Sequence, residues 1–460
     1  MASRWTGKGG IREVLSVGLP LVASMASSTV MQFTDRVFLG HYSLETLAAS
    51  ISGSMSNFVF MCFFVGVASY ANVFVAQYMG ASQPRKVGAV VWQSIWFALL
   101  AWIFMCLLAL GAPAIFALAG HSPEVQNLEV IYFRFLNIFS GANILAVGLS
   151  TFFSGRGRTR IVMLVSLFTA CINIPLDYAL IFGAGPFPRL GIAGAGLATG
   201  IGWVLSAVLY AVLIFRPRND ALYGVFRSCR LDGALFMRLM RFGIPSGVQF
   251  FLDMFGVAFF IMLVGRMGDE ALAVTNMIFS LDNFSSLPLY GLHVASEILV
   301  GRALGSNNTE QAVFAAKNAV LTCLGWAVCI AAVFVLAPGP LLEMFRPAGY
   351  DAAAFAQMRH TGEILLLYVA AWAICEAVAV GFLGALKGAG DTRFVMFLMG
   401  WSSMLTLVIP PFLLIEFFDA GVFTVWLCVV LNVFVLMAAA SLRFRRGKWK
   451  DLRVIAQASQ

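Results

Sequence analysis

The sequence predicts an all-α integral membrane protein in which twelve helices form two six-helix bundles. Three observations lead to this fold class. Of the 460 residues, 60% are hydrophobic and 11% are charged, whereas soluble domains carry roughly 25% charged residues. Continuous apolar segments of about 20 residues, enough to cross a bilayer as a helix, recur along the whole chain. The first half of the sequence also recurs in the second half, without gaps over long stretches.

The internal repeat consists of two blocks that share glycines, prolines and apolar positions. Gly18-Leu19-Pro20 returns as Gly243-Ile244-Pro245, and Ala146-Val147-Gly148 returns as Ala379-Val380-Gly381. With six spans in each copy, both copies enter the membrane from the same side, so we expect parallel repeats related by an axis along the membrane normal. Two equivalent halves in so apolar a chain favour a transporter with a path between them.

The apolar segments are continuous rather than alternating, which indicates spanning helices rather than barrel strands. In the first copy the spans lie at 14–38, 51–78, 89–112, 128–150, 161–183 and 192–215. In the second copy they lie at 243–265, 273–301, 313–337, 363–386, 394–416 and 421–442. Glycine, proline and asparagine mark short turns between them. We therefore expect an N-lobe at 1–215, a cytoplasmic linker at 216–241 and a C-lobe at 242–460 with a basic tail.

Most of the 30 basic residues fall on one side of the predicted membrane, including the N-terminus, the 216–241 linker and the C-terminal tail. The positive-inside rule makes this side cytoplasmic, and the even number of spans places both termini there. The net charge of +8 therefore reflects membrane topology, and we expect no nucleic-acid partner. The eight cysteines and four histidines lack the spacing of metal ligands, so no cofactor is expected.

Among the ionisable residues inside predicted spans, five acids stand out as candidates: Asp35, Asp177, Asp253, Asp282 and Glu376. A charged group in a membrane span is energetically unfavourable, so each of these residues is a functional candidate. Each also has a structural alternative, as a helix–helix hydrogen bond or as a residue nearer the membrane surface. A buried carboxyl group can exchange a proton against a metal or organic cation, which is the physical basis of antiport.

In the N-lobe, Asn173 and Asp177 are four residues apart and therefore share one face of a helix. Pro175, between them, frees a backbone carbonyl from the helical hydrogen-bond pattern. Asp35 and Thr199 could add further oxygen ligands. Asp35, Asn173 and Asp177 are thus candidate Na⁺ ligands, although a proton needs only a titrating carboxylate.

In the C-lobe, Asp253 and Glu376 lie among aromatic residues and methionine, a setting that suits a lipophilic cation. Most of the 42 phenylalanines and 20 methionines must nevertheless face lipid or pack between helices, so this setting alone decides little. Asp282 and Asn283 are weaker candidates for binding ion or substrate. Glu297 could pair with Arg302 as a gate or as a structural bridge.

The chain resembles the multidrug and toxic compound extrusion (MATE) transporters over nearly its whole length. The resemblance rests on Gly18-Leu19-Pro20 with Asp35 and Gly40, on Asn173 to Gly183 followed by Gly191 to Thr199, and on Lys387-Gly388-Ala389-Gly390-Asp391-Thr392. It implies two six-helix lobes that alternate between outward- and inward-open states and expel organic cations against Na⁺ or H⁺.

The resemblance also implies residue roles. Asp35 matches the family's coupling aspartate, and Asn173, Asp177 and Thr199 match the cation cluster of its N-lobe. Asp253 and Glu376 lie where the NorM-like branch has a glutamate and an aspartate, so each acid is present but exchanged for the other type. Acids in both lobes favour a NorM-like over a DinF-like assignment.

We therefore expect a secondary active transporter, not an enzyme, that works as a monomer among the lipids of the bacterial inner membrane. The alternative is a lipid-linked oligosaccharide flippase of the same superfamily. That activity requires a strongly cationic central groove for pyrophosphate, whereas the intramembrane charges here are acidic. An intramembrane enzyme would need clustered Asp-rich metal motifs, and a channel or scaffold does not require acids in both halves.

Overall fold

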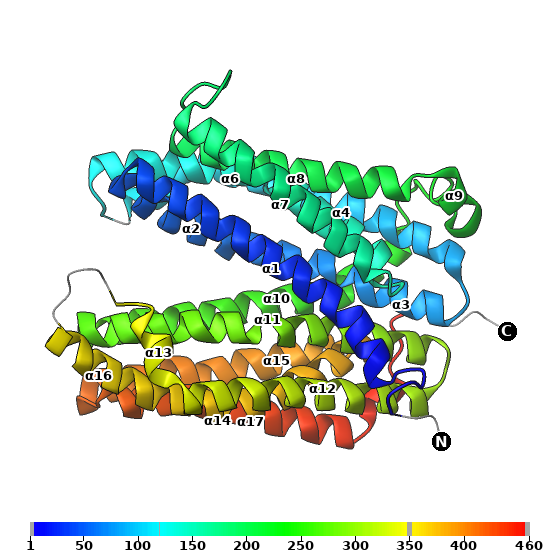
Figure 1. The fold of residues 1–460 in the computed structure, drawn as a ribbon. Helices are drawn as coiled ribbons and strands as arrows, with labels where there is room; N and C mark the ends of the chain where they lie inside the picture. Colours follow the sequence, from blue (N-terminus) through cyan, green and yellow to red (C-terminus); the bar gives the residue numbers. More distant parts are fainter. Residues whose placement is uncertain (1–3, 119, 347–351, 456–460) are drawn as a thin grey trace. The chain divides into compact units, whose positions relative to one another are not determined.

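The computed structural model describes residues 4–118, 120–346 and 352–455 of the chain. These residues form helices joined by short turns and contain no β-strand (Figure 1). The all-helical membrane fold predicted from the sequence is confirmed.

Each predicted span has a helical counterpart. In the first half these are α1 (Ile11–Tyr42), α2 (Leu44–Ser69) continued by α3 (Ala71–Gly80), α4 (Pro84–Leu110), α6 (Pro123–Ser154), α7 (Thr159–Phe182) and α8 (Ile192–Ile214). In the second half they are α10 (Gly233–Gly265), α11 (Asp269–Gly305), α12 (Thr309–Leu336), α14 (Ala352–Ala389), α15 (Thr392–Ser402) with the π-helical turn η1 (Ser403–Val408) and α16 (Ile409–Phe418), and α17 (Val422–Arg445). The connections hold α5 (Ala112–Ala117), α9 (Pro217–Tyr223), α13 (Pro338–Glu343) and the 3₁₀ turn η2 (Lys448–Asp451).

Eleven helical segments of the described residues are long and apolar enough to cross a membrane. The remaining predicted span, 273–301, lies within α11, a continuous helix of 37 residues. This helix is long enough to span a bilayer but is not among those eleven, and Asp282, His293 and Glu297 lie within it. Candidate functional residues thus lie in the predicted span that hydropathy supports less well.

The repeat is visible in backbone conformation as well as in sequence. Ser82 and Asn307, which align in the repeat, both take left-handed φ angles, of 57° and 55°. Gly157 and Gly390, which also align, take φ angles of 75° and 100°. A positive φ is strained for a residue with a side chain, so a glycine is favoured at the second pair of turns. The duplication has thus preserved the turns that connect the helices.

Contacts divide the chain into two compact units. Unit 1 comprises Met1–Val22 and Gln249–Arg453, and unit 2 comprises Ala23–Val248 and Val454–Gln460. Two of the boundaries fall inside α1 and α10, so each of these helices contributes to both units. The lobes expected at 1–215 and 242–460 follow the sequence repeat, and that division remains a prediction.

Each unit is built around one central helix. In unit 2, α6 packs against α2, α4 and α8, and in unit 1, α14 packs against α11, α12 and α17. Glycines allow these helices to approach closely: a Cβ at Gly200 of α8 would lie 2.3 Å from Phe139 Cδ2, and one at Gly384 of α14 would lie 2.5 Å from the His293 carbonyl oxygen. Such positions exclude any larger residue unless the helices move apart.

The 216–241 connector is packed onto α4 of unit 2. Trp92 Nε1 donates a hydrogen bond of 2.6 Å to the Val225 carbonyl oxygen. A Cβ at Gly88 would lie only 2.3 Å from the Tyr223 carbonyl oxygen, so the backbone of the connector touches the helix at this point. The segment is thus an ordered part of unit 2 rather than a loose tether.

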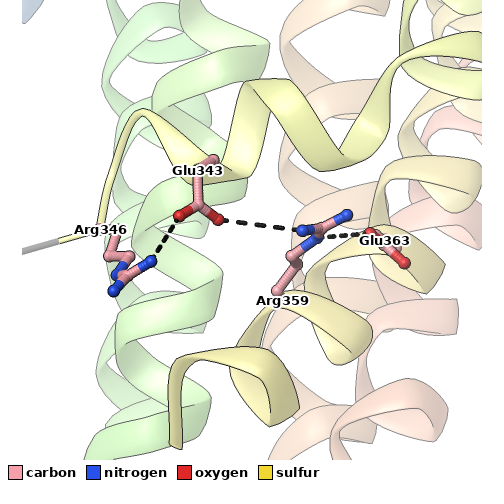
Figure 2. Close-up of polar contacts among 4 residues, drawn as sticks. All are labelled: Glu343, Arg346, Arg359 and Glu363. Atoms are coloured by element: carbon pink, nitrogen blue, oxygen red, sulfur yellow. Dashed lines mark hydrogen bonds and ion pairs between the residues drawn. The ribbon is translucent and has the colours of Figure 1, made fainter. Parts of the chain in front are cut away.

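Four charged side chains join α13 to α14 in unit 1 (Figure 2). Glu343 contacts Arg346 at 3.0 Å and Arg359 at 3.9 Å, and Arg359 also contacts Glu363 at 2.9 Å. These exposed pairs contribute little stability. Arg346 and Arg359 lie on the side of the membrane opposite the predicted basic face. Because both have acidic partners, these two arginines add little net positive charge to that opposite side.

Candidate functional site

The N-lobe candidates meet inside unit 2, where three helices contribute. The Tyr132 hydroxyl of α6 donates a 2.9 Å hydrogen bond to Asp35 Oδ2 of α1. The carboxyl groups of Asp35 and Asp177 lie close enough to share a hydrogen bond, which requires a proton between them. Asp35 is 7% exposed and Asp177 is 1% exposed. The sequence-predicted candidates therefore form a buried carboxyl pair.

Tyr132 reaches Asp35 because two glycines leave room for its ring. A Cβ at Gly53 of α2 would lie 3.0 Å from Tyr132 Cδ1, and one at Gly196 of α8 would lie 3.4 Å from Tyr132 Cδ2. The ring is thus held between α2 and α8 with its hydroxyl directed at the carboxyl group. Sequence reasoning missed Tyr132, since a tyrosine in an apolar span has no distinguishing pattern.

Asn173 lies on the same face of α7 as Asp177, one turn earlier. It is 1% exposed, and its Nδ2 atom lies 3.6 Å from the position that a Cβ of Gly202 would occupy on α8. Thr199, half-buried, is three residues before Gly202 and therefore lies on the same side of α8. The structure places these residues at the α7–α8 contact, but it records no direct bond from Thr199 to the carboxyl pair.

Three buried atoms of this cluster have no hydrogen-bond partner among the described residues, unless Asp35 and Asp177 share a proton. These atoms are Asp35 Oδ1, Asp177 Oδ1 and Asn173 Nδ2. An unpartnered buried polar atom is unfavourable unless a ligand satisfies it. The two carboxyl oxygens, and the Asn173 amide oxygen after a flip of the group, are ligands that suit Na⁺. The donor set therefore fits a small cation as well as a proton.

The C-lobe candidates form a second cluster, in unit 1. Glu376 of α14 interacts electrostatically with Asp253 of α10 and with Asp282 of α11, and Tyr290 of α11 lies within reach of all three charges. Ser286 donates a long hydrogen bond, 3.4 Å, to Glu376 Oε2. All three acids are half-buried, so the cluster is accessible. Asp282, a weaker candidate in the sequence, is brought into it.

An aromatic wall stands beside these acids. Asp282 lies close to Trp372, whose ring stacks on Trp426 with a centroid distance of 5.8 Å and an interplanar angle of 6°. Phe279 stacks on Trp426 at 5.2 Å. Asn283 is exposed, and the structure records no contact of its side chain with the acids.

The suggested pair of Glu297 with Arg302 is wrong. Arg302 Nη1 contacts Glu13 Oε1 at 3.2 Å, within unit 1, and the Gly9 amide donates to Glu13 Oε2 at 2.7 Å. Glu297 is buried and interacts with Lys387 of α14 instead. Positions 297 and 302 point about 140° apart around a helix, so the two side chains of α11 face different neighbours. Arg302 accordingly turns toward the N-terminal segment.

Comparison with known proteins agrees with the repeat. The MatE family model matches residues 20–179 and 245–412, one match in each copy. The chain is 24% identical over 451 residues to the probable multidrug resistance protein NorM of Thermotoga maritima, covering 97% of this chain and 94% of that protein. It is 27% identical over 398 residues to the multidrug resistance protein PmpM of Pseudomonas aeruginosa, covering 84% of this chain and 80% of that protein.

Solved structures share the fold. The outward-facing conformation of a multidrug resistance MATE family transporter of the MOP superfamily gives a TM-score of 0.86 at 18% identity and covers 97% of both chains. The eukaryotic MATE transporter AtDTX14 gives a TM-score of 0.83 at 19% identity and covers 95% of this chain and 96% of that chain.

Proposed function

The chain belongs to the MatE family, and we propose that it is a cation-coupled antiporter that exports organic, mostly cationic, drugs and toxins across the bacterial inner membrane. The observation that carries this proposal is the buried carboxyl pair of Asp35 and Asp177. Two adjacent carboxylates repel each other in an apolar surrounding, so one proton or one metal cation has to be held between them. Its arrival and departure can therefore be coupled to a change in structure.

In this mechanism the N-lobe residues bind the coupling ion. Asp35 and Asp177 supply charge, Tyr132 fixes the orientation of the Asp35 carboxyl group, and Asn173 with Thr199 completes the oxygen ligands if the ion is Na⁺. A bound Na⁺ would supply positive charge and nothing else. Neutralising the pair removes the repulsion that otherwise favours a more solvated arrangement of α1 and α7, which biases the alternating access of the two lobes.

The acids of unit 1 would receive the organic cation. Asp253, Asp282 and Glu376 provide negative charge, and the wall that includes Trp372 provides an apolar surface for a lipophilic body. The same acids disfavour the flippase alternative, because an anionic lipid pyrophosphate would be repelled. The NorM names of the relatives and the acids in both halves support the NorM-like branch over the DinF-like one.

The decisive experiment uses proteoliposomes that contain the full-length protein and a fluorescent organic cation. A proton gradient and a Na⁺ gradient are imposed separately, and transport is measured for the wild type and for Asp35→Asn. We expect one gradient to drive transport in the wild type and neither to drive it in the variant, with normal membrane insertion of both. Gradient-driven transport by Asp35→Asn at the wild-type rate would contradict the coupling role.

A further inference from the structure

A second buried acid of unit 2 lies outside the cluster described above. Glu129 of α6 is fully buried, and its Oε1 atom lies 2.8 Å from Nδ1 of His121, which precedes the helix. Its other oxygen, Oε2, is buried and has no hydrogen-bond partner among the described residues. The side chain of His121 is 46% exposed. His121 is therefore an exposed partner of a fully buried carboxyl group.

Glu129 is one helical turn before Tyr132, so both residues lie on the same face of α6. The two helical turns that contain Glu129 and Tyr132 both pack against Gly53 of α2. A Cβ at Gly53 would lie 3.7 Å from the Glu129 carbonyl oxygen and 3.0 Å from Tyr132 Cδ1. Tyr132 in turn donates to Asp35. Glu129, which contacts exposed His121, thus lies one helical turn from the tyrosine that contacts the buried carboxyl pair.

We propose that His121 and Glu129 form an entry station through which the coupling cation reaches the Asp35–Asp177 pair from the non-cytoplasmic side. The proposal rests on the cation coupling proposed above. A buried carboxylate attracts a cation, and its free oxygen can accept either a proton or Na⁺. The exposed imidazole can turn toward solvent as a cation arrives, because the cation then replaces it beside a carboxylate that would otherwise be buried without a partner.

The surroundings of Glu129 contain few competing charges. The helices α2, α4, α5 and α8 pack on α6, and Gly53, Phe116 and Gly196, which lie near this part of it, are uncharged. The nearest charged residues along α6 itself, Glu124 and Arg134, are both exposed. Within the described residues, His121 is the ionisable side chain that Glu129 contacts by a hydrogen bond. An arriving cation would therefore compete mainly with His121 for the carboxylate of Glu129.

The test is the cation dependence of transport by Glu129→Gln, which keeps the shape of the side chain and removes its charge. Efflux from proteoliposomes is measured over a range of Na⁺ concentrations at constant pH, and over a range of pH without Na⁺. We expect the concentration for half-maximal transport to rise about tenfold for the coupling cation, with the maximal rate retained, since one negative charge is lost from its path. Glu124→Gln is the matched control, an exposed acid at the start of α6, and should follow the wild-type curve.

Different failures are distinguishable. If wild-type transport depends on neither cation, the proposed coupling is wrong and the entry station fails with it. If the wild type is cation-dependent and Glu129→Gln gives the same curve, the station is overturned and the coupling stands. His121→Ala provides a second variant should Glu129→Gln fold poorly, and a shifted curve supports the station. Lower thermal stability of His121→Ala with an unchanged curve would assign the pair a structural role only and overturn the proposal.

Discussion

At the residue scale, the central arrangement is a carboxyl pair whose orientation depends on one hydroxyl group. Tyr132 donates to Asp35 Oδ2, while Asp35 Oδ1 has no partner among the described residues unless a proton is shared with Asp177. The carboxyl group is therefore held at one oxygen and available at the other. In the proposed mechanism this arrangement lets the site bind and release a cation without losing its geometry.

Tyr132→Phe tests this arrangement. The ring stays between its two glycines, but the carboxyl group of Asp35 loses the contact that fixes its orientation. A hydrogen bond to a charged group contributes about 1.5–3 kcal/mol, so we expect the apparent affinity for the coupling cation to fall at least about tenfold. The measurement is the cation dependence of efflux in proteoliposomes. Tyr178→Phe, an exposed tyrosine of α7, is the control, and equal effects of the two substitutions would contradict the assignment.

The acids could be predicted from the sequence because an ionisable residue stands out in an apolar span. Their grouping could be predicted only in part. Asn173 and Asp177 share a helix face by spacing alone, whereas Tyr132 depends on glycines of two other helices. Asp282 likewise joins the C-lobe cluster through its proximity to Glu376, which lies on a helix distant in the sequence. Contacts of this kind are set by packing, which a single sequence does not reveal.

At the scale of elements, the connector shows how close packing makes a polar segment part of a unit. Every predicted span coincides with a helix, and within the part of the chain that the structure describes eleven of these helices are long and apolar enough to cover the hydrophobic thickness of a bilayer. The connector carries no such signal, and its order arises from the contacts of α4 with Val225 and Tyr223. The boundaries of the compact units also lacked a signal, because they lie inside continuous helices.

Gly88→Ala should detach the connector from α4. The added methyl group would lie 2.3 Å from a backbone oxygen, which cannot move away as a side chain can, so we expect a loss of about 2–3 kcal/mol in unfolding free energy. Gly325→Ala on α12 is the control, since a Cβ there meets nothing within 4 Å and should stabilise the helix by up to about 1 kcal/mol. Thermal unfolding in detergent measures both. Equal melting temperatures for Gly88→Ala and the wild type would contradict the docking.

At the scale of the whole molecule, the two copies of the repeat share a scaffold but differ in chemistry. Turns and glycines recur in both copies, whereas Asp35 aligns with Phe260, and Glu376 aligns with Asn143. The carboxyl pair of unit 2 and the aromatic-walled acids of unit 1 are accordingly different kinds of site. The two halves are therefore expected to bind different ligands, the coupling ion and the organic cation.

The predicted topology places both termini in the cytoplasm. Green fluorescent protein fused to the C-terminus should therefore fluoresce, and alkaline phosphatase fused at the same position should be inactive, because each folds only on one side of the inner membrane. Fusions in the turn between α7 and α8 should give the opposite pair of results. An active phosphatase at the C-terminus would reverse the orientation and, with it, the side on which His121 opens.

At two of the places where the chain passes from one unit to the other, the connection is a continuous helix rather than a loop. The boundaries at Val22 and at Val248 lie within helices rather than in loops, and each follows closely on a proline, Pro20 in α1 and Pro245 in α10. A proline interrupts the helical hydrogen-bond pattern and makes bending there easier. Both helices can thus act as hinges that bend at the proline. A helix resists bending, so such a hinge is stiffer than a flexible loop. If the proposed alternating access is correct, substitutions near these prolines should change the rate of switching between states more than the affinity for the coupling ion or the organic cation.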